Sequence, residues 1–444
     1  ATEKILAELK AASVEDADAA VARAKAAFPA WRAVTPKDRG QILRRLAAEV
    51  DSKREQLAQL EARNAGKPIG DARGEVGMVV DVFNYYAGAP ERLLGNTIPV
   101  AGGIDMTFRE PLGVVGLIVP WNFPIAIASW KVGPALAAGN TIVLKPAALT
   151  PLTAIELGRI ALEAGLPEGV LNVVAGAGRT VGERLVQHPD VAKIAFTGST
   201  EVGQRIGALA AAGIKRVTLE LGGKSANIVF ADADLEKAAA AAPLAVFGNA
   251  GQDCCARSRI LVERSAVDRF MQRLETAVKA LKVGDPLDDK TEMGPLISAD
   301  HRTKVASYLD GGAHVAFRGS APAGPGYWFA PTVLSPVAPS DRAAREEIFG
   351  PIVAVIPFDG EEEAIRIAND TVYGLSGSIW TSNAGRAMRV ARALETGTIS
   401  INSNNSVRVT TPFGGFKQSG IGRELGPNAL DHYTELKNVF LSTL

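Results

Sequence analysis

The sequence predicts an α/β protein that contains a parallel sheet, and three observations support this. Short apolar runs alternate with helical stretches of about a dozen residues between Val114 and Ala211, which is the pattern of consecutive strand and helix units. The chain has 444 residues, too many for one hydrophobic core, so roughly two or three domains are expected. Apolar residues make up 47% and charged residues 22% of the chain, as in ordinary folded proteins.

The charge balance excludes several classes of partner. Lysine plus arginine and aspartate plus glutamate both number 48, so no net field attracts nucleic acid or an anionic membrane. The most apolar run, 112–119, is far too short to span a bilayer. We therefore expect a soluble, cytoplasmic protein whose partner is a small molecule. The chain begins at Ala1 without a methionine, so a removed targeting segment stays an open alternative.

Cysteine and histidine content narrows the chemistry. The two cysteines, Cys254 and Cys255, are adjacent and cannot form a long-range disulfide framework, which indicates a reducing compartment. The four histidines are scattered and show no spacing typical of metal ligands, so we predict no metal site.

Helices are expected to dominate the start of the chain. From Val14 to Ala62 apolar residues recur at helical spacing, which predicts a pair of amphipathic helices separated near Pro36. A longer helix is expected over 74–94. The segment 105–110 is typical of an exposed strand or a hairpin arm.

The next region predicts the parallel sheet itself. Strands that are separated by helices pair in parallel, and a nucleotide is expected to bind at the carboxyl ends of such strands. The expected strands are 114–119, 141–144, 170–174 and 193–196, and the expected helices are 127–138, 153–164, 181–187 and 202–211.

A second α/β region is expected in the rest of the chain. The segment 319–331, rich in glycine and proline, is predicted to be a surface loop that joins its halves. The expected helices are 235–247, 254–257, 266–281, 300–309, 361–369 and 384–394, and the expected strands are 260–262, 353–357, 378–380 and 398–401.

The stretch 247–256 contains both cysteines after an amide-rich segment. A thiolate forms near neutral pH only where a dipole, a cation or a polarised neighbour stabilises it, and Asn249 to Gln252 at the start of a helix would supply that setting. The alternative is that both cysteines are inert and buried, which is the commoner role of a free cysteine.

Glu220 stands among apolar residues that alternate as in a strand. A buried and unpaired carboxyl group has a raised pKa, which suits a general base. The alternative is a structural ion pair with a neighbour such as Lys224.

Three further candidates follow predicted strands. The amide of Asn122, between two prolines, would stabilise a developing oxyanion, or else this segment is only a rigid aromatic turn. The turn around Gly198 joins a strand to a helix, where backbone N–H groups favour a phosphate, although it lacks the GxGxxG spacing. Lys145 ends a strand and either reaches a ligand there or is simply solvated.

Six ordered motifs resemble the NAD(P)-dependent aldehyde dehydrogenase superfamily, over essentially the whole chain apart from a short amino-terminal piece that the family usually has. The resemblance implies a Rossmann-like cofactor-binding domain, a second α/β catalytic domain and a small β oligomerisation arm. The motifs are Pro-Trp-Asn-Phe-Pro at 120–124, Phe-Thr-Gly-Ser-Thr at 196–200, Leu-Glu-Leu-Gly-Gly-Lys at 219–224, Gly-Gln-Asp-Cys at 251–254, Glu-Ile-Phe-Gly-Pro at 347–351 and Pro-Phe-Gly-Gly-Phe-Lys-Gln-Ser-Gly at 412–420.

The resemblance assigns catalytic roles. Cys254, which follows Gly-Gln-x, is implied to be the nucleophile that attacks the aldehyde, with its backbone N–H and Asn122 stabilising the oxyanion. Glu220 is implied to activate the water that hydrolyses the thioester. Lys131 and Glu424 match positions that help to relay the proton outward.

The resemblance also implies NAD or NADP as the cofactor. Lys145 is expected at the adenosine ribose, and Ala148 stands where many NAD-using members have a glutamate that repels a 2′-phosphate, which weakens the case for strict NAD specificity. The other expected cofactor residues are Gly178, Gly198 and Ser199 around the adenine and pyrophosphate, Trp121 nearby, and Glu347 and Phe349 at the nicotinamide ribose.

The substrate is less defined. Gly248 and Val407 stand where aromatic residues are often found, which implies a wide aldehyde tunnel, and Asp253 resembles the acid of the aminoaldehyde and betaine aldehyde dehydrogenase-like branch, where it can face a cationic amine. The alternative is that Asp253 points away and broad aliphatic or aromatic aldehydes are taken. The other expected tunnel residues are Phe123, Ala126, Ile127, Trp130 and Phe413.

By resemblance, 1–95 and 112–221 bind the cofactor, 222–420 form the catalytic domain, and 96–111 with 432–444 are oligomerisation strands of a homodimer or homotetramer. Two other functions stay open. A CoA-acylating enzyme usually lacks the glutamate found here at Glu220, and a non-catalytic nucleotide-binding relative would be expected to have lost Glu220 or Cys254.

Overall fold

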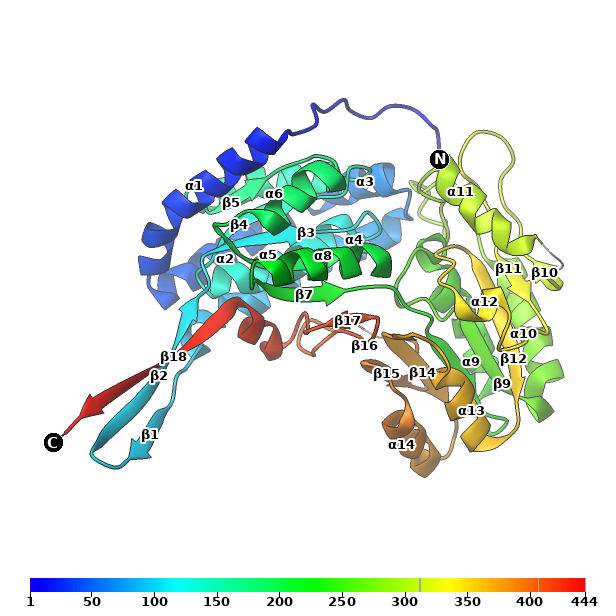
Figure 1. Ribbon diagram of the computed structural model, residues 1–444. Helices are drawn as coiled ribbons and strands as arrows, with labels where there is room; N and C mark the ends of the chain where they lie inside the picture. Colours follow the sequence, from blue (N-terminus) through cyan, green and yellow to red (C-terminus); the bar gives the residue numbers. More distant parts are fainter. Residues whose placement is uncertain (311–312, 406, 444) are drawn as a thin grey trace.

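A computed structural model describes residues 1–310, 313–405 and 407–443. The chain forms a six-stranded sheet, a seven-stranded sheet and a three-stranded arm that projects from one side (Figure 1). The mixed α/β class with parallel sheets confirms the predicted fold class. No helix among the described residues combines the length and apolarity that crossing a membrane requires.

The first sheet is parallel apart from one short edge strand. Its order is β17 (Gly420–Ile421), β7 (Arg216–Glu220), β6 (Val191–Thr197), β3 (Val114–Ile118), β4 (Thr141–Lys145) and β5 (Leu171–Val173). Its helices and turns are α1 (Val14–Ala33), α2 (Pro36–Ser52), α3 (Arg54–Ala65), α4 (Ile69–Ala87), η1 (Pro90–Arg92), α5 (Pro124–Ala137), α6 (Leu152–Glu163), η2 (Gly178–Gly182), α7 (Glu183–Gln187) and α8 (Thr200–Ala212).

Helices cover both faces of this sheet, because alternate side chains of a strand point to opposite sides. In β3, Val115 and Leu117 join one hydrophobic core with α2 to α6, whereas Val114 and Ile118 join another with α1, α7 and α8. The strands therefore have continuous apolar sequences, as expected of a parallel sheet buried on both faces.

The second sheet is also parallel apart from its edge strand β10. Its order is β10 (Val315–Arg318), β11 (Thr332–Leu334), β12 (Ile352–Phe358), β9 (Arg259–Glu263), β8 (Ala226–Val229), β14 (Ser376–Trp380) and β15 (Thr398–Ile401). Its helices and turns are α9 (Leu235–Phe247), η3 (Gly248–Gly251), η4 (Arg264–Ala266), α10 (Val267–Ala280), α11 (Ala299–Ala306), η5 (Ser307–Leu309), α12 (Arg342–Arg345), α13 (Gly360–Asn369) and α14 (Ala384–Ala393).

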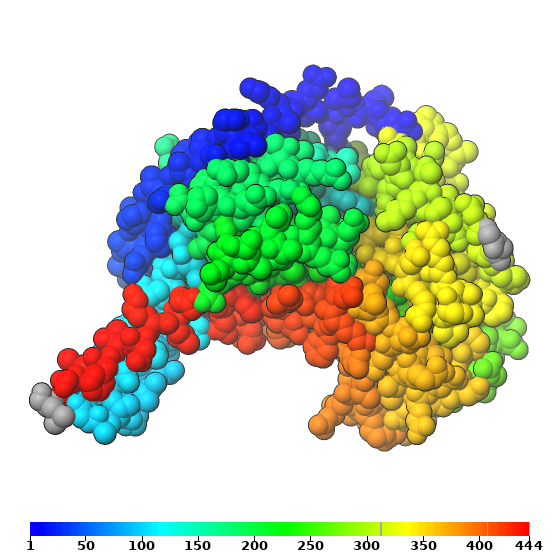
Figure 2. Space-filling view, in the orientation of Figure 1, coloured from blue at the N-terminus to red at the C-terminus, as the bar shows by residue number. Residues whose placement is uncertain are grey.

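After the second sheet the chain returns to the first. The short ladder of β13 (Tyr373–Gly374) with β16 (Phe416–Lys417) precedes β17, which pairs with β7 of the first sheet. The space-filling view shows this part of the chain as an orange-red band that runs from the second sheet toward the arm (Figure 2). It ends in η6 (Pro427–Tyr433) and β18 (Thr434–Ser442).

The arm is an antiparallel sheet of β1 (Thr97–Val100), β2 (Gly103–Pro111) and β18. Strands β2 and β18 pair in register from Thr434 opposite Pro111 to Ser442 opposite Gly103. Side chains on one face of this ladder are apolar and exposed, among them Ile104, Phe108 and Leu441. The predicted domain boundaries and the pairing of this arm between subunits stay predictions.

Three expected elements differ in the structure, and one of them, the helix expected over 74–94, runs over Ile69–Ala87 instead. The predicted pair of helices over 14–62 is three, because the chain breaks at Lys53 between α2 and α3. The predicted helix 254–257 is wrong: this segment is a turn, because the Cys255 backbone N–H bonds to Asp253 Oδ1 (2.8 Å) and the Arg257 guanidinium binds the Cys255 carbonyl (2.6 Å). These contacts use the groups that would continue a helix.

Candidate active site

The candidate site lies between the two sheets. The carboxyl ends of β3, β6 and β7 meet there with the segments that precede β8, β9 and β12. These elements enclose a cavity of about 230 Å³. Its lining residues are Pro120, Trp121, Asn122, Thr197, Gly198, Ser199, Leu221, Gly222, Cys254, His301, Lys304, Glu347 and Phe349.

The segment before Cys254 has an unusual backbone. Asn249, Ala250 and Gly251 all have positive φ, at 51°, 56° and 70°. At Gly251 a side chain is excluded, because a Cβ atom would lie 2.3 Å from the Gly350 carbonyl oxygen. The Gln252 side chain fixes the segment further by accepting from the Ile297 N–H (2.8 Å) and donating to the Asn249 carbonyl (3.0 Å). The position of the Cys254 thiol is therefore set by a tight, strained turn.

The surroundings of Cys254 do not favour its thiolate. Contact with the Cys255 thiol, burial and the nearby carboxylates of Asp253 and Glu347 together raise the pKa of the Cys254 thiol well above its usual value. The amide-rich segment was expected to lower the pKa of the Cys254 thiol, whereas its surroundings together raise this pKa. The thiol needs a base or a bound cation to lose its proton.

Asn122 lines the same cavity as Cys254. Its side-chain Nδ2 donates to the Gln252 carbonyl (3.1 Å), which leaves the second amide hydrogen for a ligand. Among the described residues, the backbone N–H of Cys254 has no acceptor. Two unsatisfied N–H donors therefore lie beside the thiol, as an oxyanion requires.

Glu220 is the last residue of β7 and is 4% exposed. Neither carboxyl oxygen has a hydrogen-bond partner among the described residues. Burial and the neighbouring Glu424 raise the pKa of Glu220 well above its usual value, against the opposing effect of Lys131. Thr197, its register partner on β6, and Leu221, the next residue, both line the cavity, so Glu220 adjoins the cavity lining.

Lys131 and Glu424 form a fully buried ion pair. Lys131 Nζ lies 2.5 Å from Glu424 Oε1, while Glu424 Oε2 is without a partner among the described residues. The pair joins α5 to the segment after β17. Both groups influence the pKa of Glu220, so the three side chains form one electrostatic unit.

The edge of the first sheet fits a dinucleotide cofactor. Lys145 Nζ, at the end of β4, donates to the Pro146 carbonyl (2.9 Å), and burial lowers the pKa of Lys145 to about 8. Ser199 caps α8, and the buried hydroxyl of Thr197 has no partner among the described residues. Gly178 faces open space where a Cβ would meet nothing within 4 Å. A helix start, a cation and a free hydroxyl suit a pyrophosphate and its riboses.

Glu347 and Phe349 complete this side of the cavity. Glu347 Oε1 accepts from the Gly223 N–H (2.8 Å), and burial raises its pKa to about 7. Trp121 meets the Phe349 ring edge to face, with centroids 5.3 Å apart. His301, which the sequence did not indicate, packs on Trp121 and bonds through Nε2 to the Phe349 carbonyl (2.7 Å).

The predicted substrate residues share one apolar region. Trp130 and Phe413 meet edge to face with centroids 5.4 Å apart. Gly248 borders open space, since a Cβ there would meet nothing within 4 Å. The predicted residues Phe123, Ile127, Trp130, Val407 and Phe413 belong to the same hydrophobic cluster as Cys254, and Ala126 is buried on α5 beside them.

Asp253 takes part in the turn at Cys254, and whether it faces the substrate stays a prediction. Its Oδ1 accepts from the Cys255 N–H, so one carboxyl oxygen serves the local turn. Burial raises its pKa. Asp253, Cys254 and Cys255 are also the one group of possible metal ligands found close together in the described part of the chain, with donor atoms within 4.8 Å of one another.

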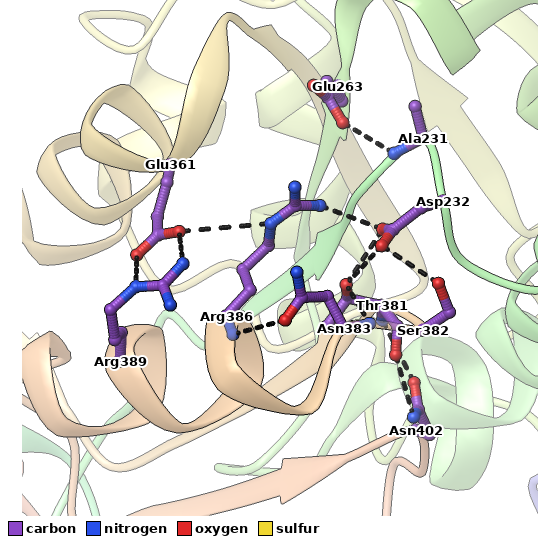
Figure 3. Close-up of polar contacts among 10 residues, drawn as sticks. All are labelled: Ala231, Asp232, Glu263, Glu361, Thr381, Ser382, Asn383, Arg386, Arg389 and Asn402. Carbon is purple, nitrogen blue, oxygen red and sulfur yellow. Dashed lines mark hydrogen bonds and ion pairs between the residues drawn. The ribbon is translucent and has the colours of Figure 1, made fainter.

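The carboxyl edge of the second sheet, a common place for a ligand in such sheets, is closed by its own side chains. Asp232, after β8, accepts hydrogen bonds from Thr381 (2.9 and 3.0 Å) and from Arg386 (3.0 Å) (Figure 3). Arg386 also lies 4.0 Å from Glu361, which pairs with Arg389. These charges satisfy one another, so the cavity between the sheets is the better candidate.

Comparison with known proteins agrees with this geometry. The chain matches the model of the aldehyde dehydrogenase family over residues 1–439. An aldehyde dehydrogenase of Emericella nidulans is 44% identical over 444 residues, covering 98% of this chain and 89% of that protein. A betaine aldehyde dehydrogenase of Bacillus subtilis is 44% identical over 441 residues, covering 97% and 90%.

Solved structures are equally similar. The NAD⁺ complex of an aldehyde dehydrogenase from Bacillus cereus has a TM-score of 0.98 at 44% identity, covering 100% of this chain and 92% of that one. PnpE from Pseudomonas sp. WBC-3 has a TM-score of 0.97 at 46% identity, covering 99% and 92%.

Proposed function

Because this chain belongs to the aldehyde dehydrogenase family, as its motifs predicted, we propose that it oxidises an aldehyde to the carboxylic acid with NAD or NADP. One observation carries the proposal. Cys254 and Asn122 line a single cavity between the two sheets, and Glu220, whose carboxyl group is unpartnered among the described residues, adjoins the cavity lining.

The first steps use Cys254 and the two free donors. The Cys254 thiol gives its proton to solvent, its sulfur bonds to the aldehyde carbon, and the carbonyl electrons move onto oxygen. Asn122 Nδ2 and the Cys254 backbone N–H stabilise that oxyanion. When bound, the nicotinamide ring supplies the acceptor for the hydride that leaves the same carbon, so a thioester remains on Cys254.

Glu220 then acts as the base for hydrolysis. It takes a proton from a water that attacks the thioester carbon, and collapse of the tetrahedral intermediate breaks the carbon–sulfur bond. We also propose that the buried pair of Lys131 and Glu424, whose charges influence the pKa of Glu220, helps to relay this proton outward. A base at this position favours hydrolysis over transfer of the acyl group to CoA.

Both NAD and NADP are proposed as cofactors. Ala148 is exposed and carries no charge, so this position does not repel a 2′-phosphate. We expect comparable kcat/KM for the two cofactors. A preference for NAD above about a hundredfold, roughly 3 kcal/mol, would contradict dual use.

Two substrate classes have support. The betaine aldehyde dehydrogenase relatives and the acid at Asp253 favour an ω-aminoaldehyde. The bond from Asp253 to the Cys255 N–H, together with the apolar cluster around Trp130 and Phe413, favours broad aliphatic or aromatic aldehydes. The first class is our proposal and the second is the alternative.

The assembly is proposed to be a homodimer or homotetramer joined through the arm. The location is proposed to be cytoplasmic, because the two adjacent cysteines indicate a reducing compartment.

The activity itself is tested by absorbance at 340 nm with NAD or NADP and a panel of aldehydes. We expect the wild-type protein to turn over at least one aldehyde and the Cys254→Ala variant to turn over none. Folded protein without turnover of any aldehyde would overturn the proposal in favour of a non-catalytic relative.

A further inference from the structure

A buried lysine lies beneath the loop that carries Asn122. Lys67 is the residue before Pro68 at the start of α4, and its side chain is 0% exposed. Its ammonium donates to both carboxyl oxygens of Glu75 (2.5 and 2.6 Å) and to the backbone carbonyl of Asn122 (2.9 Å). It also lies 4.4 Å from the centre of the Phe123 ring. One cation therefore contacts two successive residues of the loop.

The same loop is held at two other points. Asn249, in the strained turn before Cys254, donates through Nδ2 to the Asn122 carbonyl (2.9 Å). Glu61, which is fully buried on α3, accepts from the Ile125 N–H (3.2 Å) and is itself held by the Thr153 hydroxyl (2.6 Å). The loop is thus tied to α3, to the start of α4 and to the nucleophile segment.

We propose that Lys67 is a positioning residue for the oxyanion donor Asn122, an inference that rests on the proposed function. The peptide unit is planar, so fixing the Asn122 carbonyl oxygen fixes the plane that follows its Cα. With this plane fixed, the Cα of Asn122 has a fixed position. From there the side-chain Nδ2 donates to the Gln252 carbonyl (3.1 Å) at the edge of the cavity. Lys67 and Asn249 together saturate both lone pairs of that carbonyl oxygen.

The charge of Lys67 matters as well as its hydrogen bonds. A buried ammonium is costly unless it is paired, and Glu75 provides the pairing while the Asn122 carbonyl takes the remaining direction. Removal of Lys67 alone would leave the Glu75 carboxyl group buried without its partner. The loop that carries Asn122 would then lose its hydrogen bond from Lys67 and also lie next to an unpaired carboxyl group. The experiment has to separate these two effects.

The test uses three reactions of the 444-residue protein. Aldehyde oxidation and the cofactor-free hydrolysis of p-nitrophenyl acetate both pass through an oxyanion beside Cys254, whereas alkylation of Cys254 by iodoacetamide does not. Lys67→Met is compared with the double variant Lys67→Met, Glu75→Leu, which removes both buried charges and so guards against misfolding. Arg39→Met removes another buried cation, bound to the carbonyls of Arg32 and Val34 away from the cavity, and is the matched control.

We expect both Lys67 variants to lose about 10- to 100-fold in kcat for aldehyde and for ester, as for a displaced oxyanion donor. Alkylation and the KM for the cofactor should stay within about twofold of wild type, and Arg39→Met should leave all the rates unchanged. Equal loss of all three reactions, or no loss of the first two, would overturn the proposal.

A failure of the proposed function can be distinguished from a failure of the inference about Lys67. If the wild-type protein oxidises no aldehyde, the proposed activity falls, while ester hydrolysis and alkylation of Cys254 still decide the role of Lys67. An undiminished ester rate in the double variant would overturn the role of Lys67 even if aldehyde oxidation is confirmed.

Discussion

Glu220 is a carboxyl group held away from water and from hydrogen-bond donors. Its raised pKa means that the protonated form, which cannot act as a base, persists above the usual titration range of glutamate. The rate of thioester hydrolysis should therefore rise with pH through this raised pKa. For an ordinary glutamate, the midpoint of this rise would lie at about pH 4.5.

Glu220→Gln should uncouple the two halves of the reaction. Because the oxidative half does not need this base, we expect a burst of up to one reduced cofactor per Cys254, followed by turnover that is about 10²- to 10⁴-fold slower. Stopped-flow absorbance at 340 nm measures both phases. Unchanged steady turnover without a burst would remove Glu220 from the mechanism.

Asp253 influences the Cys254 thiol, whatever its role toward the substrate. Its charge is one of the causes of the raised pKa of Cys254, so Asp253→Asn should lower that pKa and speed alkylation by iodoacetamide at pH 7. The asparagine side chain keeps an oxygen that can accept from the Cys255 N–H, so the turn should persist. A slower alkylation would show that the carboxylate serves the turn and does not oppose the thiolate.

The same variant separates the two substrate classes. If Asp253 faces a cationic amine, Asp253→Asn should raise KM for 4-aminobutyraldehyde much more than for hexanal. An equal change for both aldehydes would favour the broad-specificity alternative.

At the scale of the element, the turn from Asn249 to Gln252 decides where the thiol lies. Gly251→Ala places a Cβ 2.3 Å from the Gly350 carbonyl oxygen and at φ 70°, so we expect a destabilisation of about 1–3 kcal/mol and a fall in kcat. Thermal unfolding and turnover are the measurements.

Gly248→Ala is the matched control for this change, because a Cβ there meets nothing within 4 Å and the backbone has φ −50°. It should unfold at the wild-type temperature. If the two variants behave alike, the close approach to Gly350 does not constrain the turn.

At the scale of the whole molecule, the arm presents an apolar face to solvent. Side chains opposite one another in an antiparallel ladder share a face, so Ile104 and Leu441 lie together, and they are 40% and 54% exposed. Such a face on a projecting sheet is expected to be covered by another subunit.

Ile104→Glu with Leu441→Glu should therefore shift the assembly toward monomer in light scattering. Asn438→Glu, on the other face of β18, is the control and should leave the molar mass unchanged. A wild-type monomer at micromolar concentration would contradict the proposed role of the arm.

The alternation of apolar runs and helices determined the α/β class, because this pattern depends on local propensity and on burial of both sheet faces. The ordered motifs also determined the family, and they singled out Cys254, Asn122 and Glu220, since residue identities and spacings are visible without coordinates. The roles of these residues in catalysis stay predictions that the experiments above test.

Only the tertiary structure decided the surroundings of those residues. Lys67 lies 55 positions from Asn122, and His301 lies 48 positions from Phe349, so no local pattern indicates either contact. The segment at Cys254 is a turn and not the predicted helix. The pKa of the Cys254 thiol lies above its usual value, whereas the sequence suggested a value below it. Both outcomes depend on burial and on neighbouring groups that the local pattern does not show. The sequence by itself names the candidate reacting groups, whereas their protonation and orientation follow from contacts that only the folded chain makes.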